Sequence, residues 1–369
     1  MDFREELSAF PSGVHRCIYA AARGITPLDR SLASVEDPGM RASCEEFHGF
    51  FMDFLSDMYD HPEAYGLPVM ALENFCNGKT VNGMKQKFPS KTKSILSQTR
   101  NSVNGYMVLL YMMGRLGVLS GDILSLSPDD LKEADKRTNT SVSPIPLAVR
   151  LRALARVGLL QEGGGFVSKR HPGMFPAMCA LAKKAKKQSG FDYFAFKNAE
   201  FRNIGANYKP TYEDYFHPLI ESQLKQANTL HEYAIKMGLK PTVSTFWKVE
   251  YKYKGAQVMC IGTEGDHERK LDIRLVGTYN WDDPGLINDR LIKESPEFQK
   301  YAVRHVLRCD ACSTAHLGRF VTVLGKRQRV CGGGLIGFRW NNPDDGDVEA
   351  IKQFIRLRME IIEEINQKE

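Results

Sequence analysis

The alternation of side chains over residues 247–254 is the strongest constraint that this sequence places on its fold. Apolar and charged positions follow one another without a break: Trp247, Val249, Tyr251 and Tyr253 alternate with Lys248, Glu250, Lys252 and Lys254. Since neighbouring side chains of a strand point to opposite faces, the pattern predicts a strand with one buried face. Such a strand needs partners to bury that face, so this part of the chain must contain a sheet.

Further strands and helices are expected around this one. Apolar positions near Val258 and Cys260 predict a second strand. A third is predicted where Leu271, Ile273 and Leu275 alternate with Asp272 and Arg274. Helices are expected over 212–237, around 297–306 and from about Asp347 onwards. Short strands in close succession favour an antiparallel sheet with helices on one face, so the predicted fold class of this half is α+β.

The last of these helices carries a broad apolar stripe, formed by Val348, Ile351, Phe354, Ile355, Met359 and Ile362. Two interpretations of the stripe stay open. It either packs into the core of its own domain or forms the interface of a homodimer.

The first 190 residues follow a helical pattern instead. One apolar stripe recurs at the spacing of a helix face and predicts a core helix: Phe47, Phe50, Phe51, Phe54 and Leu55. Between Ser143 and Gly190 the chain carries nine Lys and Arg side chains and one acidic residue, Glu162, although the net charge of the whole sequence is only +6. Dense positive charge is what phosphate neutralisation requires; a solvated basic surface without a ligand is the alternative.

The order of elements in this basic region is informative. A helix near 101–116, a short helix after Ser127-Pro128, an Arg-rich helix after Pro146 and a hairpin around Gly163-Gly164-Gly165 are expected in succession. Over residues 103–168 this order resembles a winged helix, with residues 159–168 as the wing. The resemblance rests on order and spacing, and winged helices also serve as protein-interaction modules.

If the resemblance holds, the Arg-rich helix enters the major groove of DNA. The residues predicted to contact DNA are then those of this helix, of the wing's exit and of the following helix: Arg150, Arg152, Arg156, Lys169, Arg170, Lys183 and Lys184.

Cysteines cluster in one place only. Cys309 and Cys312 have the spacing that lets two thiolates reach one ion from a tight turn, and Cys331 supplies a third. With His316 as the fourth ligand, or His305 as its rival, the set predicts a structural Zn²⁺ site in a knuckle-like loop. The other five are expected to be buried apolar residues: Cys17, Cys44, Cys76, Cys179 and Cys260.

Three alternatives to zinc stay open. Cys309 and Cys312 form a redox-active dithiol beside Arg308, or the three cysteines hold an iron–sulfur cluster, or they only pack. Trp247, Tyr251 and Tyr253 are first of all packing residues; alternatively they line a ligand pocket beneath the helices.

The compartment is predicted from what the sequence lacks. It has no run of ~18 uncharged apolar residues for a membrane span, and its opening Met1-Asp2-Phe3-Arg4-Glu5-Glu6 carries acids where a signal peptide needs a basic start and an apolar core. Eight cysteines in 369 residues are too dilute for a disulfide scaffold. A cytoplasmic protein with reduced thiols and no membrane partner is expected.

Together these features predict two domains, a helical winged-helix-like basic domain over 1–190 and an α+β domain with the cysteine-rich loop over 191–369. The function they favour is a DNA-binding transcriptional regulator whose C-terminal domain senses a small-molecule effector or a metal, or dimerises. An enzyme that binds a small molecule in the α+β domain and a non-enzymatic interaction protein are the alternatives, because no catalytic motif is complete.

Overall fold

The structure is a computed structural model that describes residues 3, 10–69, 80–81, 84–85, 90–138, 145–187, 190–205, 208–244, 248–263, 271–276, 285–306, 319–330 and 337–368. Helices and antiparallel sheets are both present, which confirms the α+β class. The described residues form two compact units, one ending at Pro210 and one beginning at Thr211. The boundary predicted at residue 190 falls inside unit 1, because helix α9 packs against α8 and α5 of that unit.

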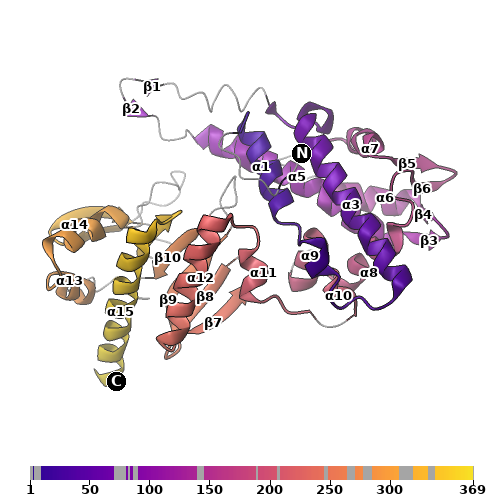
Figure 1. Cartoon of the computed structure of the whole chain (residues 1–369). Helices are drawn as coiled ribbons and strands as arrows, with labels where there is room; N and C mark the ends of the chain where they lie inside the picture. The colour runs from indigo at the N-terminus through magenta and orange to yellow at the C-terminus, as the bar shows by residue number, and fades with distance from the viewer. Residues whose placement is uncertain are drawn as a thin grey trace. The chain divides into compact units, whose positions relative to one another are not determined.

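Unit 1 is mainly helical (Figure 1). Its elements are α1 (Gly13–Arg23), α2 (Leu28–Ser31), α3 (Pro38–Asp60), η1 (Pro62–Tyr65), β1 (Thr80–Val81), β2 (Met84–Lys85), α5 (Ser90–Leu116), β3 (Val118–Ser120), β4 (Ile123–Ser125), α6 (Pro128–Thr138), α7 (Leu147–Arg156), β5 (Leu159–Glu162), β6 (Gly165–Ser168), α8 (Phe175–Lys184), α9 (Gly190–Lys197) and α10 (Arg202–Gly205).

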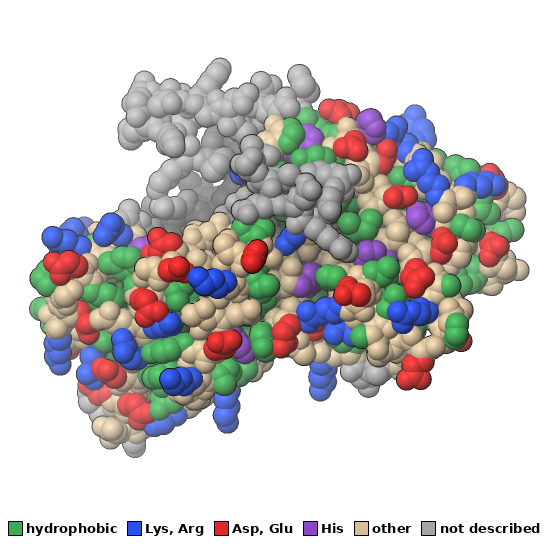
Figure 2. Space-filling model, in the orientation of Figure 1, with side chains coloured by type: hydrophobic (Ala, Val, Ile, Leu, Met, Phe, Trp, Pro, Cys, Tyr) green, Lys and Arg blue, Asp and Glu red, His purple; other side chains and the backbone are tan. Residues whose placement is uncertain are grey.

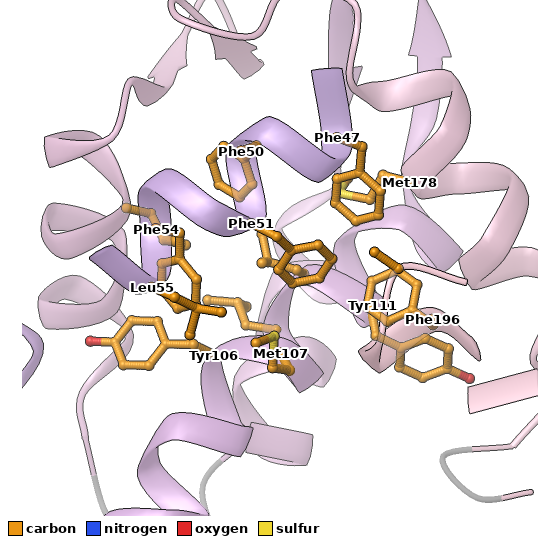
Figure 3. Packing of buried hydrophobic residues seen from close by; sticks show 14 of the residues in the cluster. Phe47, Phe50, Phe51, Phe54, Leu55, Tyr106, Met107, Tyr111, Met178 and Phe196 are labelled. Atoms are coloured by element: carbon orange, nitrogen blue, oxygen red, sulfur yellow. The ribbon is translucent and has the colours of Figure 1, made fainter. Parts of the chain in front are cut away.

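The predicted phenylalanine stripe forms the centre of this unit. All five of its residues on α3 are fully buried, and they meet side chains of α5, α8 and α9 (Figure 3). Phe54 lies 5.6 Å from Tyr106 of α5 between ring centroids, and Phe47 lies 5.9 Å from Phe196 of α9. Burying side chains of this size is worth roughly 1.5–3 kcal/mol each, so the stripe is a main source of the unit's stability.

Unit 2 is a five-stranded sheet with helices. Its elements are α11 (Tyr212–Phe216), α12 (Glu221–Lys236), β7 (Lys240–Ser244), β8 (Lys248–Tyr253), β9 (Ala256–Gly262), β10 (Asp272–Val276), α13 (Gly285–Leu291), α14 (Pro296–His305), β11 (Arg319–Val323), β12 (Lys326–Val330), β13 (Gly337–Asn341) and α15 (Asp345–Lys368). The single helix predicted over 212–237 is two helices. Pro218 lies between them, and a proline cannot donate the backbone hydrogen bond that an uninterrupted helix would need there.

The sheet has the strand order β13-β10-β9-β8-β7, and all its pairs are antiparallel. The predicted strand is β8, whose buried positions include Val249 and Tyr251. Figure 1 shows α12 and α15 crossing in front of the strands. The face that they cover is apolar: Phe338 and Trp340 of β13 lie 4.4 and 5.4 Å from Phe354 of α15 between ring centroids.

No helix in the described ranges is long and apolar enough to cross a membrane.

Candidate functional site

The predicted DNA-contacting helix, α7, belongs to the segment of the chain that runs from α5 to β6. Strands β3 and β4 form a hairpin after α5, α6 and α7 follow, and β5 and β6 form a second hairpin. The two hairpins join into one sheet of order β3-β4-β6-β5. The hairpin expected at 159–168 is therefore present. Its turn is Gly163-Gly164, both with positive φ, as the two-residue turns that match strand twist require.

Arg150 does not lie on the surface of α7. Its side chain is fully buried, with Nε donating to the carbonyl of Ile145 at 3.2 Å and Nη2 to that of Thr138 at 3.4 Å. The guanidinium also lies over the ring of Tyr106, 5.3 Å from its centroid. Burial at these contacts contradicts the prediction that Arg150 touches DNA. The residue instead ties α7 to the end of α6 and to α5.

Arg156 forms an ion pair with a residue far away in sequence. Its Nε and Nη2 donate to the two carboxylate oxygens of Asp57 on α3, at 2.7 and 3.0 Å, and the hydroxyl of Tyr65 donates to the same carboxylate at 2.8 Å. Burial alone raises the pKa of Asp57, but the hydrogen bonds from Arg156 and Tyr65 outweigh it and lower that pKa below its ordinary value. Arg156 is thus engaged in fixing α7 on α3, although 37% of its side chain stays exposed.

Two basic positions at the end of the hairpin β5–β6 also have acidic neighbours. Lys169 contacts Glu162 across the hairpin, 2.8 Å from Nζ to carboxylate. His171, just beyond the hairpin, lies between two carboxylates of α3, 3.0 Å from Asp53 and 3.6 Å from Glu46. These carboxylates offset part of the positive charge around the hairpin.

A smaller set of cations remains exposed. Arg152 of α7, Arg170 after β6, Lys183 of α8, and Lys186 and Lys187 just after α8 are exposed. Within the described residues none of them has an ion pair. Lys184 is half-buried. Figure 2 shows Lys and Arg side chains over the end of unit 1 that holds α7, β5 and β6, with acidic side chains interspersed.

The aromatic residues of β8 lie toward the helices. Tyr251 is fully buried, and its hydroxyl lies 2.7 Å from Nδ1 of His231 on α12. The ring of Tyr212 stacks on that imidazole, with centroids 3.6 Å apart. The hydroxyl of Tyr253 donates to Glu363 of α15. Trp247 lies outside the described residues, and the predicted ligand pocket stays a prediction.

The cysteine cluster is beyond what the structure describes. Cys309, Cys312, His316 and Cys331 all lie outside the described ranges, and within those ranges no three His, Cys, Asp or Glu side chains come close enough to share a metal. The rival ligand His305 stacks on Trp340, 5.1 Å between centroids. Four of the isolated cysteines are confirmed as buried thiols, Cys17, Cys44, Cys179 and Cys260, while Cys76 is not described.

Sequence reasoning missed the residues that hold α7 in place and the charged residues of unit 2 that pair across strands. Asp57 is 99 positions from Arg156, and Asp272 is 67 positions from its partner Arg339, so no local pattern links either pair. Only the alternation of charged with apolar residues in β10 indicated that Asp272 and Arg274 share a face.

No protein-family model matches the chain, and neither a curated protein nor a solved structure is similar enough to it to count as a match.

Proposed function

We propose that the protein is a DNA-binding regulator and that unit 1 binds duplex DNA through α7 and the hairpin β5–β6. The support is topological. The elements follow in the order helix α5, hairpin β3–β4, helices α6 and α7, and hairpin β5–β6, with β4 pairing to β6 and β6 to β5. This order resembles that of a winged helix. The resemblance is the observation that carries the proposal.

The exposed cations define the surface proposed to contact the backbone. Arg152 is exposed on α7 and Arg170 follows β6. Lys183 near the end of α8, with Lys186 and Lys187 just after it, adds three more cations. A set of this size suits phosphate neutralisation without sequence reading, which supplies most of non-specific affinity. Arg156 and Lys169 contribute less, because each is already paired with a carboxylate.

A salt-titrated anisotropy assay on a fluorescent random duplex tests the proposal. We expect the protein to bind the duplex at low salt, with an affinity that falls steeply as the salt concentration rises. The double variant Arg152→Ala, Arg170→Ala should lower the slope of log affinity against log salt by about 2, one for each lost phosphate contact. The matched control, Lys236→Ala with Lys240→Ala in unit 2, removes two exposed cations elsewhere and should leave the slope unchanged.

Two results would contradict DNA binding. One is that the protein does not bind the duplex even at low salt. The other is an equal loss in the test and control variants, because that would reduce the effect to net charge. In the first case the same surface would be assigned to a protein partner, which winged-helix modules also bind.

The zinc site predicted from Cys309, Cys312, His316 and Cys331 is also a proposal. The hairpin β11–β12 supports it. Arg319 pairs with Val330, so the two strands open at one end of the hairpin. Cys331 follows Val330 directly in the chain and His316 precedes Arg319 by three positions. Ligands on both sides of a hairpin's open end can reach a single tetrahedral ion.

A further inference from the structure

The hairpin β11–β12 of unit 2 presents one face to solvent and buries the other. Phe320 is 58% exposed, whereas Val323, three positions further on and therefore on the opposite face, is fully buried. Asn288 of α13 anchors the hairpin. Its Nδ2 donates to the carbonyl of Thr322 at 2.9 Å, and its Oδ1 accepts from the backbone N–H of Leu324 at 3.1 Å. An aromatic side chain is thus held outward on a fixed backbone.

A cation stacks on the exposed ring. The guanidinium carbon of Arg327 lies over the ring of Phe320, 4.2 Å from its centroid. The register explains this contact, because Arg327 pairs with Thr322 and so lies diagonally across the two strands from Phe320, on the same face. A planar guanidinium over a ring makes a flat surface that is both apolar and positively charged.

The rest of the hairpin adds positive charge around this pair. Residues 319–330 contain no acidic residue and four cations, Arg319, Lys326, Arg327 and Arg329. Lys326 and Arg327 are exposed, and neither has an ion pair within the part of the chain that the structure describes. Their charges are therefore available to an anionic partner.

A nucleic acid with unpaired bases is the polyanion that fits both the charge and the ring. Positive charge alone suits any phosphate backbone, including that of a duplex. Inside a duplex, however, each base is covered by its neighbours in the stack, so an exposed ring gains nothing there. In a single strand the bases are free to stack on aromatic side chains and on guanidinium planes. The exposed Phe320–Arg327 pair therefore indicates single-strand binding.

We propose that the hairpin β11–β12 binds single-stranded DNA, with a base stacked on the Phe320–Arg327 pair and a phosphate beside Lys326. The choice of DNA over RNA rests on the function proposed for unit 1, whereas the stacking chemistry does not. In a DNA-binding regulator this surface would hold a strand that is exposed where the duplex opens.

Fluorescence anisotropy of the whole chain with a labelled oligo(dU) of about 15 nucleotides tests this, beside the random duplex used for unit 1. The readout is the ratio of single-strand affinity to duplex affinity, because cations contribute to both. Phe320→Leu should lower this ratio by about fivefold or more, the loss expected for one stacked base, since leucine is apolar but has no flat face. Phe320→Tyr keeps the ring and should stay within about twofold of the unchanged protein.

Ile292→Ala is the matched control. Ile292 is 67% exposed and lies in the same unit, so the variant removes exposed apolar area without removing a ring, and the ratio should not change. The proposal is overturned if oligo(dU) does not bind at low salt, or if Phe320→Leu leaves the ratio unchanged. It is also overturned if oligo(rU) of the same length binds more tightly, because the hairpin would then be assigned to RNA.

The two proposals fail separately. The Arg152, Arg170 double variant tests duplex binding by unit 1, whereas Phe320→Leu tests the hairpin. If the duplex does not bind at all, the affinity for oligo(dU) itself becomes the readout.

Should Phe320→Leu fail to fold, Arg327→Gln replaces it. This variant removes the guanidinium plane and one charge, so the affinity for oligo(dU) should fall and the slope of log affinity against log salt should decrease by about 0.7. An unchanged affinity and slope would equally overturn the proposal.

Discussion

At the scale of single residues, Arg150 shows how charge can be misread. Its place among three arginines of a predicted basic helix indicated a DNA contact, but its guanidinium is buried against Tyr106. Gly105, in the middle of α5, makes this possible, because a Cβ there would lie closer to Nη1 of Arg150 than van der Waals contact permits. A glycine that lowers the helix propensity of α5 thus makes room for a charge in the core.

Arg150→Met should destabilise unit 1 by about 1.5–3 kcal/mol. The substitution leaves the carbonyls of Ile145 and Thr138 without their charged donor while the aliphatic stem is largely preserved. Urea unfolding followed by circular dichroism measures the change. Arg152→Met, on the exposed face of the same helix, is the control and should stay within about 0.5 kcal/mol of the unchanged protein. Equal values for both variants would contradict the structural role of Arg150.

His231 predicts a pH dependence for unit 2. Burial lowers its pKa below the ordinary value, against the opposing effect of Glu213 and Glu232. With a folded-state pKa below that of the unfolded chain, about 6.5, the unfolded state takes up the proton first as pH falls. Stability is then complete above that pH and declines below it.

Thermal melts between pH 7.5 and 5.5 test this. We expect His231→Gln to lose fewer degrees of Tm over this range than the unchanged protein, by a few degrees. The amide can still accept from Tyr251 but cannot titrate. The same loss in both proteins would mean that other groups cause the pH dependence.

At the scale of elements, α7 is held in place by α3 through Asp57 and Arg156. Asp57→Asn should therefore lower the free energy of unfolding at pH 7 by about 1 kcal/mol, the upper range for a partly exposed pair. Because the folded-state pKa of Asp57 is lowered, its contribution is present above the unfolded pKa of about 3.9 and is lost as pH falls through the folded value. Unfolding of both proteins at pH 7 and near pH 3 should show the difference shrinking. A difference that is the same at both pH values would exclude the charge as its cause.

The zinc site proposed at the open end of the hairpin β11–β12 can be tested by metal analysis. Elemental analysis of protein purified without chelator should give about one zinc per chain, and Cys309→Ser should remove it. Cys179→Ser, a buried cysteine of α8, is the control and should keep its metal. Iron in place of zinc would favour a cluster, and no metal in the unchanged protein would leave a dithiol or simple packing.

At the scale of the whole molecule, unit 1 has a core of its own. The cluster of buried apolar residues that includes the phenylalanine stripe runs from Phe3 to Phe201, and its members all lie before the boundary at Pro210. We therefore expect residues 1–210 to fold without unit 2. A cooperative thermal transition by circular dichroism would confirm it, whereas residues 1–190 should be less stable because Phe196 and Phe201 are missing from the core. Equal stability of the two fragments would show that α9 and α10 add nothing.

The sequence by itself determined the elements that rest on periodicity. The alternation around Tyr251 predicted β8, the apolar stripe predicted that α3 is a core helix, and the glycines predicted the hairpin β5–β6. Each of these patterns is local, because the residues that form it are close together in the sequence. The α+β class followed from those elements.

Tertiary structure decided what depends on distant partners. Whether an arginine of α7 faces solvent or the core was set by Gly105 and Asp57, and which charges of unit 2 meet was set by the register that pairs β10 with β13. A charged residue looks the same in sequence whether its partner is water, a carboxylate or a ligand. The free energy of each choice comes from burial and hydrogen bonds, and only the folded chain supplies them.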